Sequence, residues 1–305
     1  MKSPAHQGRK RQAETSTPQT VDLSDVTICA ADSAFVELTA RALRLSMVGC
    51  RFGDAILFSD AKVDGPFRTV PIRRLASVDD YSHFCLREMA AHIRTPFALV
   101  VQWDGYVINP QGWANAFRKY DYIGAPWHGM FAPGVPLVGN GGFSLRSRKL
   151  LKAIGQLPPA GNLLEDRVIC LAHRERLERE FGVRFAPVKL ADRFSYQYKI
   201  PEVLPFGFHG VEHLWRHAGP EGFSAIAEKL DVGKANAGNM FQLIQNLVAN
   251  GDAEAARALY LRFRLRLPPH LITIAREKEV GPEAAAREVR DLERLVSGAV
   301  EETPE

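Results

Sequence analysis

Short, continuous runs of apolar residues alternate with helix-forming segments along the first hundred residues of this chain. Three such runs cover residues 26–30, 55–58 and 97–101, and segments with a helical spacing of apolar residues lie between them, at 33–47 and 79–93. A strand that is apolar at every position has both faces covered, and strands that alternate with helices are typical of a parallel sheet between helices. We therefore expect an α/β fold of the Rossmann-like kind.

An aspartate follows each of the three apolar runs. Asp32, Asp60 and Asp104 stand just beyond the carboxyl ends of the first, second and third run. In a parallel sheet these ends share one edge, and ligands bind in the crevice beyond it. The sequence thus predicts a polar ligand site at that edge. A turn closed by Asp104 and Gly105 without any ligand explains that pair equally well.

The two ends of the chain differ in composition from its central part. Residues 1–24 are polar and basic without apolar periodicity, which predicts a disordered tail. Three segments with helical periodicity follow the central part, at residues 240–247, 253–265 and 282–296. A single helical hairpin is too little for a repeat array. We therefore predict a body over residues 25–220 and a helical appendage over residues 232–305.

Composition narrows the classes of function. The formal net charge of the 305 residues is +4, and the N-terminal tail carries part of it, so no basic stripe indicates a nucleic-acid-binding protein. The four cysteines are far apart and lack metal-ligand spacing, which favours a reduced, cytoplasmic setting. No apolar run reaches the roughly 20 residues that span a bilayer. We expect no transmembrane segment, and peripheral contact with the inner membrane face is compatible with the sequence.

A glycine-rich turn, Gly139-Asn140-Gly141-Gly142, leads into the apolar and basic segment 143–146. Glycines allow the backbone to approach a ligand closely, and free N–H groups there bind phosphate or hydroxyl oxygens. A flexible turn without a ligand is the alternative. The turn fits neither the dinucleotide fingerprint GxGxxG nor the P-loop pattern GxxxxGK[ST], which disfavours nicotinamide and P-loop chemistry.

Two further polar features follow the glycine turn. The carboxylates Glu165 and Asp166 stand at a predicted helix start, where acids also serve merely to offset the helix dipole. As a catalytic group, one of them has to reach an acceptor hydroxyl. His209 lies between glycines and aromatic residues, which suits a packed core histidine as well as a ligand to Mn²⁺ beside an aspartate. The residues alone leave these alternatives open.

Two tryptophans lie close to these motifs in the sequence. Trp103 precedes Asp104, and Trp127 precedes the glycine-rich turn. Large aromatic side chains in such positions are most often part of the core. Their nearness to polar motifs makes stacking on a nucleoside base or a sugar the alternative.

Five short motifs in a fixed order resemble a nucleotide-sugar-dependent glycosyltransferase of the GT-A type. They are VQWDG, DYIGAPW, GNGGFSLR, an ED pair and FGFHG, at residues 101–105, 121–127, 139–146, 165–166 and 206–210. The set looks especially like a little-characterised bacterial family, and the resemblance covers the chain from residue 26 to residue 210. It implies a GT-A-like (Rossmann-like), mostly parallel sheet between helices, to which the small C-terminal α-helical appendage is added.

The resemblance also implies roles for individual residues. Asp104 takes the place of the aspartate that holds Mn²⁺ or Mg²⁺, His209 that of the late histidine of the metal site, and Gln102 that of the first aspartate of a DxD motif. Asp166 matches the base of inverting enzymes, with Glu165 orienting it or the acceptor. The acceptor loop corresponds to Gly139, Asn140, Gly141, Gly142 and Trp127, and donor contacts to Asp32, Asp60, Gln102, Trp103 and Asp104.

The resulting prediction is a metal-dependent, hexosyltransferase-like enzyme. It moves a sugar from a nucleotide-diphosphate donor, with inversion, to a hydroxyl of a glycan or lipid-linked acceptor, as in cell-surface polysaccharide assembly. Gln102, which brings no charge, motivates an alternative in which the protein binds nucleotide sugars or carbohydrates with weak turnover or none. A second alternative is an assembly scaffold that binds a protein partner through the C-terminal helices.

Overall fold

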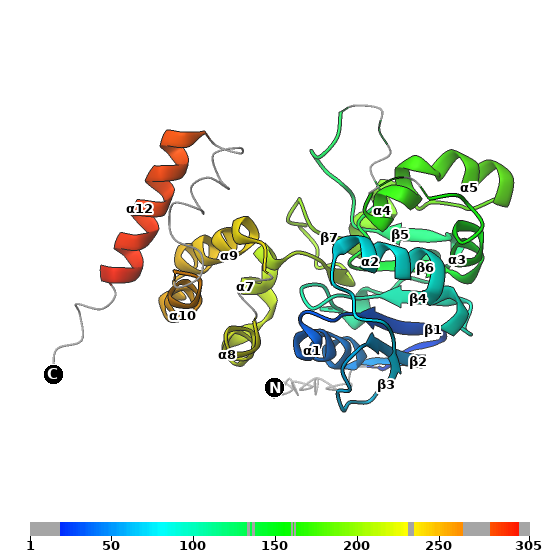
Figure 1. Cartoon of the computed structure of the whole chain (residues 1–305), viewed down its shortest axis with the longest axis horizontal. Coiled ribbons are helices and arrows are strands. Elements are labelled where there is room, and N and C mark those ends of the chain that lie inside the picture. The colour runs from blue at the N-terminus through cyan, green and yellow to red at the C-terminus, as the bar shows by residue number, and fades with distance from the viewer. Residues whose placement is uncertain are drawn as a thin grey trace, which may run out of the picture.

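A mixed sheet of six strands, covered by helices, forms the centre of the protein (Figure 1). The computed structural model describes residues 19–132, 135, 138–159, 161, 163–230, 235–264 and 281–298. Most of the expected tail and part of the expected appendage lie outside these ranges. The alternation predicted from the apolar runs is confirmed as a mixed α/β architecture, consistent with a Rossmann-like fold.

Four parallel strands make up one side of the sheet. β1 (Val21–Ala31) lies between β2 (Cys50–Ser59) and β4 (Phe97–Val100), and β3 (Arg68–Pro71) forms the edge beyond β2. On the other side, β6 (Ser144–Ser147) runs antiparallel to both β4 and β5 (Tyr122–Gly124). The strand order is β3-β2-β1-β4-β6-β5. The order therefore reverses between β1 and β4, and the ends of these two strands flank the crevice in which such sheets bind ligands.

The first strand begins at Val21, five residues before the apolar run that predicted it. In this first part buried Leu23 alternates with exposed Asp22 and Ser24, and Asp22 forms an ion pair of 2.8 Å with Arg51 of β2. Residues 21–23, which composition assigned to the tail, thus pair with β2. A half-exposed strand carries polar residues at every second position, which is why the segment looks like a polar tail in sequence.

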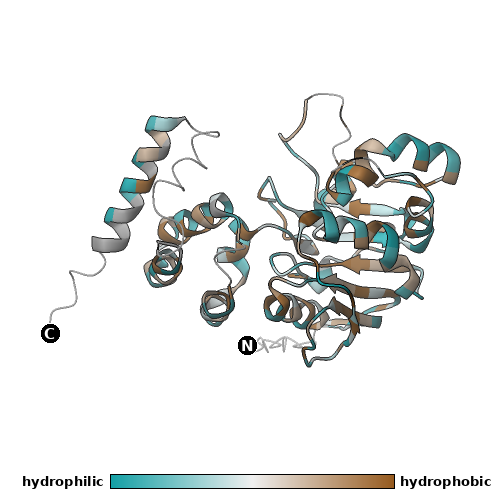
Figure 2. Ribbon diagram, in the orientation of Figure 1, coloured by the Kyte–Doolittle hydropathy of each residue, from teal (hydrophilic) through white to brown (hydrophobic). Residues whose placement is uncertain are grey.

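Helical layers cover both faces of the parallel strands. Ile28 of β1 belongs to a core cluster with residues of α1 (Val36–Met47), whereas Cys29 packs on the opposite face with the segment that follows α2 (Val78–His83). Successive side chains of a strand point to opposite faces, so both must be apolar when both faces are covered. This explains the continuous apolar runs, which Figure 2 shows as brown strands between helices with teal outer surfaces.

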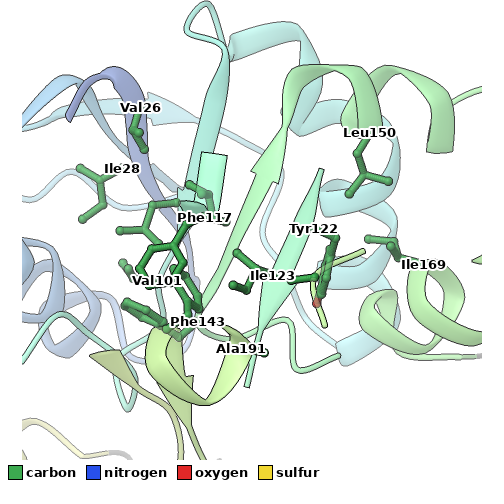
Figure 3. Close-up of a cluster of buried hydrophobic side chains, with 14 of the residues drawn as sticks. Val26, Ile28, Val101, Phe117, Tyr122, Ile123, Phe143, Leu150, Ile169 and Ala191 are labelled. Carbon is green, nitrogen blue, oxygen red and sulfur yellow. The ribbon is translucent and has the colours of Figure 1, made fainter. Parts of the chain in front are cut away.

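The β5–β6 side of the sheet carries three further helices, α3 (Arg148–Ile154), α5 (Arg174–Phe181) and α6 (Val188–Phe194). Figure 3 shows the side chains of Tyr122 and Ile123 of β5 between Leu150 of α3 and Ala191 of α6. Phe143, the residue that follows the glycine-rich turn, is fully buried in the same cluster. This core anchors the end of the turn.

The C-terminal helices pack on one another and on α1. They are α7 (Leu214–His217), α8 (Gly219–Lys229), α9 (Ala237–Ala249), α10 (Ala253–Arg264) and α12 (Pro282–Gly298). The three predicted helical segments correspond to α9, α10 and α12, whereas the sequence analysis missed α8 because Gly219, Pro220 and Gly222 are typical of a loop. The division of the chain into a body and an appendage stays a prediction. In the described part of the chain, no helix has the length and apolar character needed to cross a membrane.

Candidate active site

The turn after β4 lies at the edge where ligands are expected. Gln102 and Gly105 exchange two backbone hydrogen bonds of 3.2 and 3.0 Å, which close a tight two-residue turn around Trp103 and Asp104. The backbone carbonyl of Asp104 accepts the N–H of Gly210 at 2.9 Å. A Cβ on Gly105 would lie 2.8 Å from the His209 ring, so glycine allows the turn to approach the histidine this closely.

His209 stands at the centre of the candidate site, directly after β8 (Gly207–Phe208), which pairs with β7 (Ser195–Tyr196). Its Nε2 lies 3.6 Å from Asp104 Oδ1 and 3.0 Å from Gln102 Oε1. Its Nδ1 lies 3.2 Å from Asn140 Nδ2 and 3.3 Å from Gln197 Oε1. With the proton on Nε2 the ring donates to Gln102. With the proton on Nδ1 it donates to Gln197, which frees Nε2 as a ligand.

The glycine-rich turn closes over this histidine. A Cβ on Gly142 would lie 2.0 Å from His209 Nε2, so a larger residue there would displace the ring. Asn140 is buried and has a φ of 56°, in the left-handed region. Its amide nitrogen donates to Gln197 Oε1, while its buried Oδ1 has no partner among the described atoms. The turn and the histidine are therefore parts of one arrangement.

Gly141 links the turn to the carboxylate pair. Its N–H donates to Asp166 Oδ2 at 3.1 Å, and its carbonyl accepts from Arg146 Nη2 at 3.1 Å and Ser144 Oγ at 3.0 Å. Asp166 Oδ1 accepts the N–H of Arg167 at 2.7 Å within α4 (Glu165–Arg167). Unlike Glu165, Asp166 remains half-buried.

Glu165 points the other way, into the protein. Its Oε1 accepts from Arg146 Nη2 at 2.9 Å, and both side chains are buried. Burial raises the pKa of Glu165, and the neighbouring charge of Asp166 raises it further, against the opposing charge of Arg146. For Arg146, burial is the largest single influence and favours the neutral form, but Glu165 together with Tyr122, Cys85 and Tyr81 outweighs it and keeps the pKa above its ordinary value. The two side chains form a buried ion pair in which each charge depends on the other.

The structure thus brings together eight of the residues predicted from sequence. They are Gln102, Asp104, Asn140, Gly141, Gly142, Glu165, Asp166 and His209. Trp127, which the sequence analysis placed with the acceptor loop, is buried. Its ring lies directly against the glycine-rich turn, since a Cβ on Gly139 would lie 2.1 Å from it. The tryptophan therefore supports the turn from the core side.

Three predicted donor contacts lie outside this group. The carboxylate of Asp32 holds the turn directly before α1, where it accepts from Ala34 N at 2.6 Å, Phe35 N at 2.8 Å and Thr39 Oγ1 at 2.5 Å. Trp103 packs on Phe35 with ring centroids 5.1 Å apart. Asp60 lies 3.8 Å from Arg74 and lines a separate cavity of about 450 Å³ formed by residues 59–71.

Sequence analysis missed several residues that hold the site together. Tyr81 accepts a hydrogen bond from Gln102 Nε2 at 2.9 Å, and Gln197 bonds Asn140 and His209. Glu212 follows the FGFHG motif, and burial raises the pKa of its carboxyl beside His209 and Asp104. Neither Tyr81 nor Gln197 belongs to a recognisable pattern. For Glu212 the adjacent motif was the only available signal.

The residues around His209 suit a divalent cation in part. Asp104 Oδ1, Gln102 Oε1 and His209 Nε2 supply a carboxylate, an amide oxygen and an imidazole, with the two oxygens 3.6 and 3.0 Å from the nitrogen. Ligands at about 2.1 Å from one ion lie roughly 3 Å apart or more, so this set fits a shared ion. No group of three His, Cys, Asp or Glu side chains with metal-binding geometry occurs in the described part of the chain. A cation held by Gln102, Asp104 and His209 would have three protein ligands, and water or a bound ligand would have to complete its coordination shell.

Comparison with known proteins gives a family match and a distant structural likeness. The sequence model of a family described as "Protein of unknown function (DUF5672)" matches residues 65–209, which include every residue of the site from Tyr81 to His209. No curated protein matches the chain. Among solved structures, the chain is similar to the mannosyltransferase PcManGT from Pyrobaculum calidifontis in complex with GDP-Man and Mn²⁺. That similarity has 12% identity and a TM-score of 0.38, over 96% of this chain and 80% of that chain.

Proposed function

We propose that this protein is an inverting glycosyltransferase that moves a sugar from a nucleotide-diphosphate donor to an acceptor hydroxyl. The observation that carries the proposal is the convergence, beside the β1–β4 crevice, of two unlike groups on one glycine-rich turn. Asp104 and His209 approach it from one side and Asp166 from the other. A donor diphosphate suits the first group, and an acceptor hydroxyl suits the second.

Each side of the site has a distinct task in this reaction. Gln102, Asp104 and His209 would hold a Mn²⁺ or Mg²⁺ ion together with the donor phosphates. Such an ion would supply Lewis-acid stabilisation of the charge on the departing diphosphate. Asp166 accepts the proton of the acceptor hydroxyl as that oxygen attacks the anomeric carbon.

The glycine-rich turn positions this base. The N–H of Gly141 holds Asp166 Oδ2, and the carbonyl of the same residue is held by Arg146. Because Glu165 fixes Arg146 from behind, the ion pair determines where the turn and the base stand. Glu165 therefore acts as a positioning residue behind Asp166. A preorganised base of this kind needs little rearrangement on binding.

A thermal-shift screen tests donor binding. UDP-, GDP-, CMP- and dTDP-sugars are added with and without Mn²⁺ to the wild type, to Asp104→Ala and to Asp22→Ala, which removes an exposed ion pair far from the site. A ligand that binds only the folded state raises the melting temperature. We expect one donor class to give a metal-dependent shift that Asp104→Ala abolishes and Asp22→Ala retains. No shift with any donor in the folded wild type contradicts the proposal.

Turnover is tested with the donor found in that screen. Asp166→Asn keeps the size of the side chain and removes the base, so we expect the donor shift to persist while transfer to an acceptor falls by about 10²–10⁴-fold. The configuration of the product at the anomeric carbon, read by NMR, tests inversion. Normal transfer by Asp166→Asn would refute the assignment of the base.

One observation supports a second candidate, a nucleotide-sugar-binding protein without turnover. Gln102 gives the cation site an amide where a second carboxylate would bring charge, and its Nε2 is already engaged by Tyr81. This candidate predicts donor binding without donor consumption. Gln102→Asp then strengthens the Mn²⁺ dependence of the melting temperature without creating transfer activity.

A further inference from the structure

Large apolar side chains are exposed on three loops, which we call the apolar rim. The loop at residues 198–204, between β7 and β8, exposes Ile200 by 50%, Val203 by 81% and Leu204 by 49%, besides Tyr198. Leu163 and Leu164 are exposed directly before α4, and Met130 is exposed on the loop at residues 128–131. Of the exposed large apolar residues in the described part of the chain, only Val48, Val78 and Leu261 lie elsewhere. The exposure is therefore concentrated.

The three loops meet around the carboxylate pair. Leu164 immediately precedes Glu165. The guanidinium of Arg167 lies 5.9 Å from the ring centre of Phe131, which places the loop at 128–131 beside α4. Tyr198 is only partly buried, and this partial burial together with the charge of Asp166 raises its pKa to about 12, which places Tyr198 near that carboxylate. In Figure 1 the loop after β7 and the loop at residues 128–131, which follows β5, project to the same side of the sheet.

Basic residues surround the apolar side chains of the longest loop. Lys199 lies within the loop, Arg193 is exposed at the end of α6, and Arg167 lies beside it on α4. The acids nearby are Asp192, which contacts His128 at 2.8 Å, Glu202 within the loop, and Asp166 and Glu212 near Tyr198. Arg193 and Lys199 also line a cavity of about 500 Å³ together with Trp113, Val203 and Leu204. The surface thus combines exposed apolar tips with lysine and arginine side chains at their edges and a cavity beside them.

This combination matches an anionic bilayer better than a protein surface. Apolar side chains that enter the headgroup region, a tyrosine at the interface and lysines or arginines beside them are the features by which proteins bind anionic lipid surfaces. Pro201 and Pro205 restrict the backbone of the loop, so less conformational freedom is lost when it docks. The apolar rim lies beside Asp166, so a bilayer bound to it would face that carboxylate.

We propose that the apolar rim docks on the surface of an anionic phospholipid bilayer. The docking stands independently of the reaction. Its consequence, that a membrane-borne hydroxyl reaches Asp166, rests on the proposed function. Ile200, Val203 and Leu204 enter the interface, and Lys199, Arg193 and Arg167 meet the phosphates.

Vesicle sedimentation tests the docking. The full chain is mixed with vesicles of phosphatidylcholine alone or with about 30% phosphatidylglycerol, at about 0.1 and 0.5 M salt. We expect the wild type to sediment with the anionic vesicles at low salt and to be released at high salt. The triple variant Ile200→Ser/Val203→Ser/Leu204→Ser is expected to lose at least about fivefold in the bound fraction. Lys199→Ser is expected to bind more weakly than the wild type, with a smaller effect of salt.

The double variant Val48→Ser/Val78→Ser is the matched control, because it removes exposed valines outside the rim. It is expected to bind as the wild type does. Circular dichroism checks that all variants keep their melting temperature. Absence of wild-type binding, equal binding by the triple variant, or an equal loss in the control overturns the proposal. So does a wild-type dimer in gel filtration that the triple variant dissociates, because a second copy then covers the rim.

Discussion

The two sides of the candidate site are built in different ways. On the histidine side, Gln102, Asp104 and His209 meet through contacts of 3.0–3.6 Å to an imidazole whose proton has two alternative acceptors. On the arginine side, Gly141, Arg146, Glu165 and Asp166 are joined by hydrogen bonds of 2.9–3.1 Å around a buried ion pair. The first side can rearrange when a ligand arrives, whereas the second is fixed before it arrives. The proposed reaction, which combines a cation on the histidine side with a fixed base on the arginine side, would require this division.

The strongest test breaks the arginine side. Arg146→Leu leaves the Glu165 carboxylate buried without a partner, so we expect a loss of about 3–5 kcal/mol in the free energy of unfolding. Urea denaturation measures it. Arg51→Leu, which breaks an exposed pair, is expected to stay within about 1 kcal/mol. The double variant Arg146→Leu/Glu165→Leu should recover part of the loss. Equal effects at Arg146 and Arg51 would contradict the account of a buried pair.

Adding one methyl group to each of two neighbouring glycines compares the sides directly. A Cβ on Gly141 would lie 1.9 Å from Glu165 Oε1, and one on Gly142 would lie 2.0 Å from His209 Nε2. We expect both alanine variants to lose about 1–3 kcal/mol, with the greater loss for Gly141→Ala because the ion pair cannot move away as the histidine ring can. Gly155→Ala is the control, since its Cβ would meet nothing closer than 3.6 Å. A greater loss for Gly142→Ala would reverse the comparison.

Asp32 was predicted to contact the donor but lies outside the group of residues around His209. Asp32→Ala removes the acceptor for the N–H groups of Ala34 and Phe35, directly before α1, so we expect a loss of about 1–2 kcal/mol, as for a helix cap. If capping is its whole task, the melting temperature falls while the shift caused by the donor persists. Loss of the donor shift in a folded Asp32→Ala variant would instead include this residue in the donor site, as the sequence analysis predicted.

Acid is expected to weaken the region behind His209. Burial lowers the pKa of His217 to about 4, below the 6.5 of an unfolded chain, and the charge of Arg216 contributes. Between these two values the unfolded chain binds a proton that the folded chain does not, so stability falls as the pH drops from about 6.5 to 4. The side chain is partly exposed, and we expect about 1 kcal/mol in total. Between pH 6.5 and about 4, the melting temperature of His217→Gln should therefore change less with pH than that of the wild type. If the melting temperature of the variant changes with pH as much as that of the wild type, His217 is not the group that causes the loss of stability.

The sequence predicted those parts of the fold and of the site that a local pattern of residue types indicates. The apolar runs predicted the central strands because both faces of these strands are covered. Asp104, Gly141 and His209 were found because short motifs surround them, although Asp104 and His209 are 105 positions apart in the chain. Their contact depends on the turn after β4 meeting β8, which no local pattern specifies.

Other features could not be read from the sequence. Gln197 and Tyr81 act through single hydrogen bonds from positions without any motif. Glu165 and Asp166 are adjacent and look equivalent in sequence, but Glu165 turns inward to Arg146 whereas Asp166 stays half-buried. Only the packing of α4 against β6 distinguishes them. Similarly, no motif indicates that the carboxylate of Asp32 accepts hydrogen bonds from the N–H groups of Ala34 and Phe35, directly before α1.

The position of α1 determines how the protein loses its structure on heating. Ala40 and Leu43 of this helix belong to the core beneath the sheet, whereas Leu38 and Ala42 belong to the core shared with α8, α9 and α10. Neither core can open without exposing apolar surface of the same helix. We therefore expect the sheet and these C-terminal helices to melt cooperatively, as a single calorimetric transition.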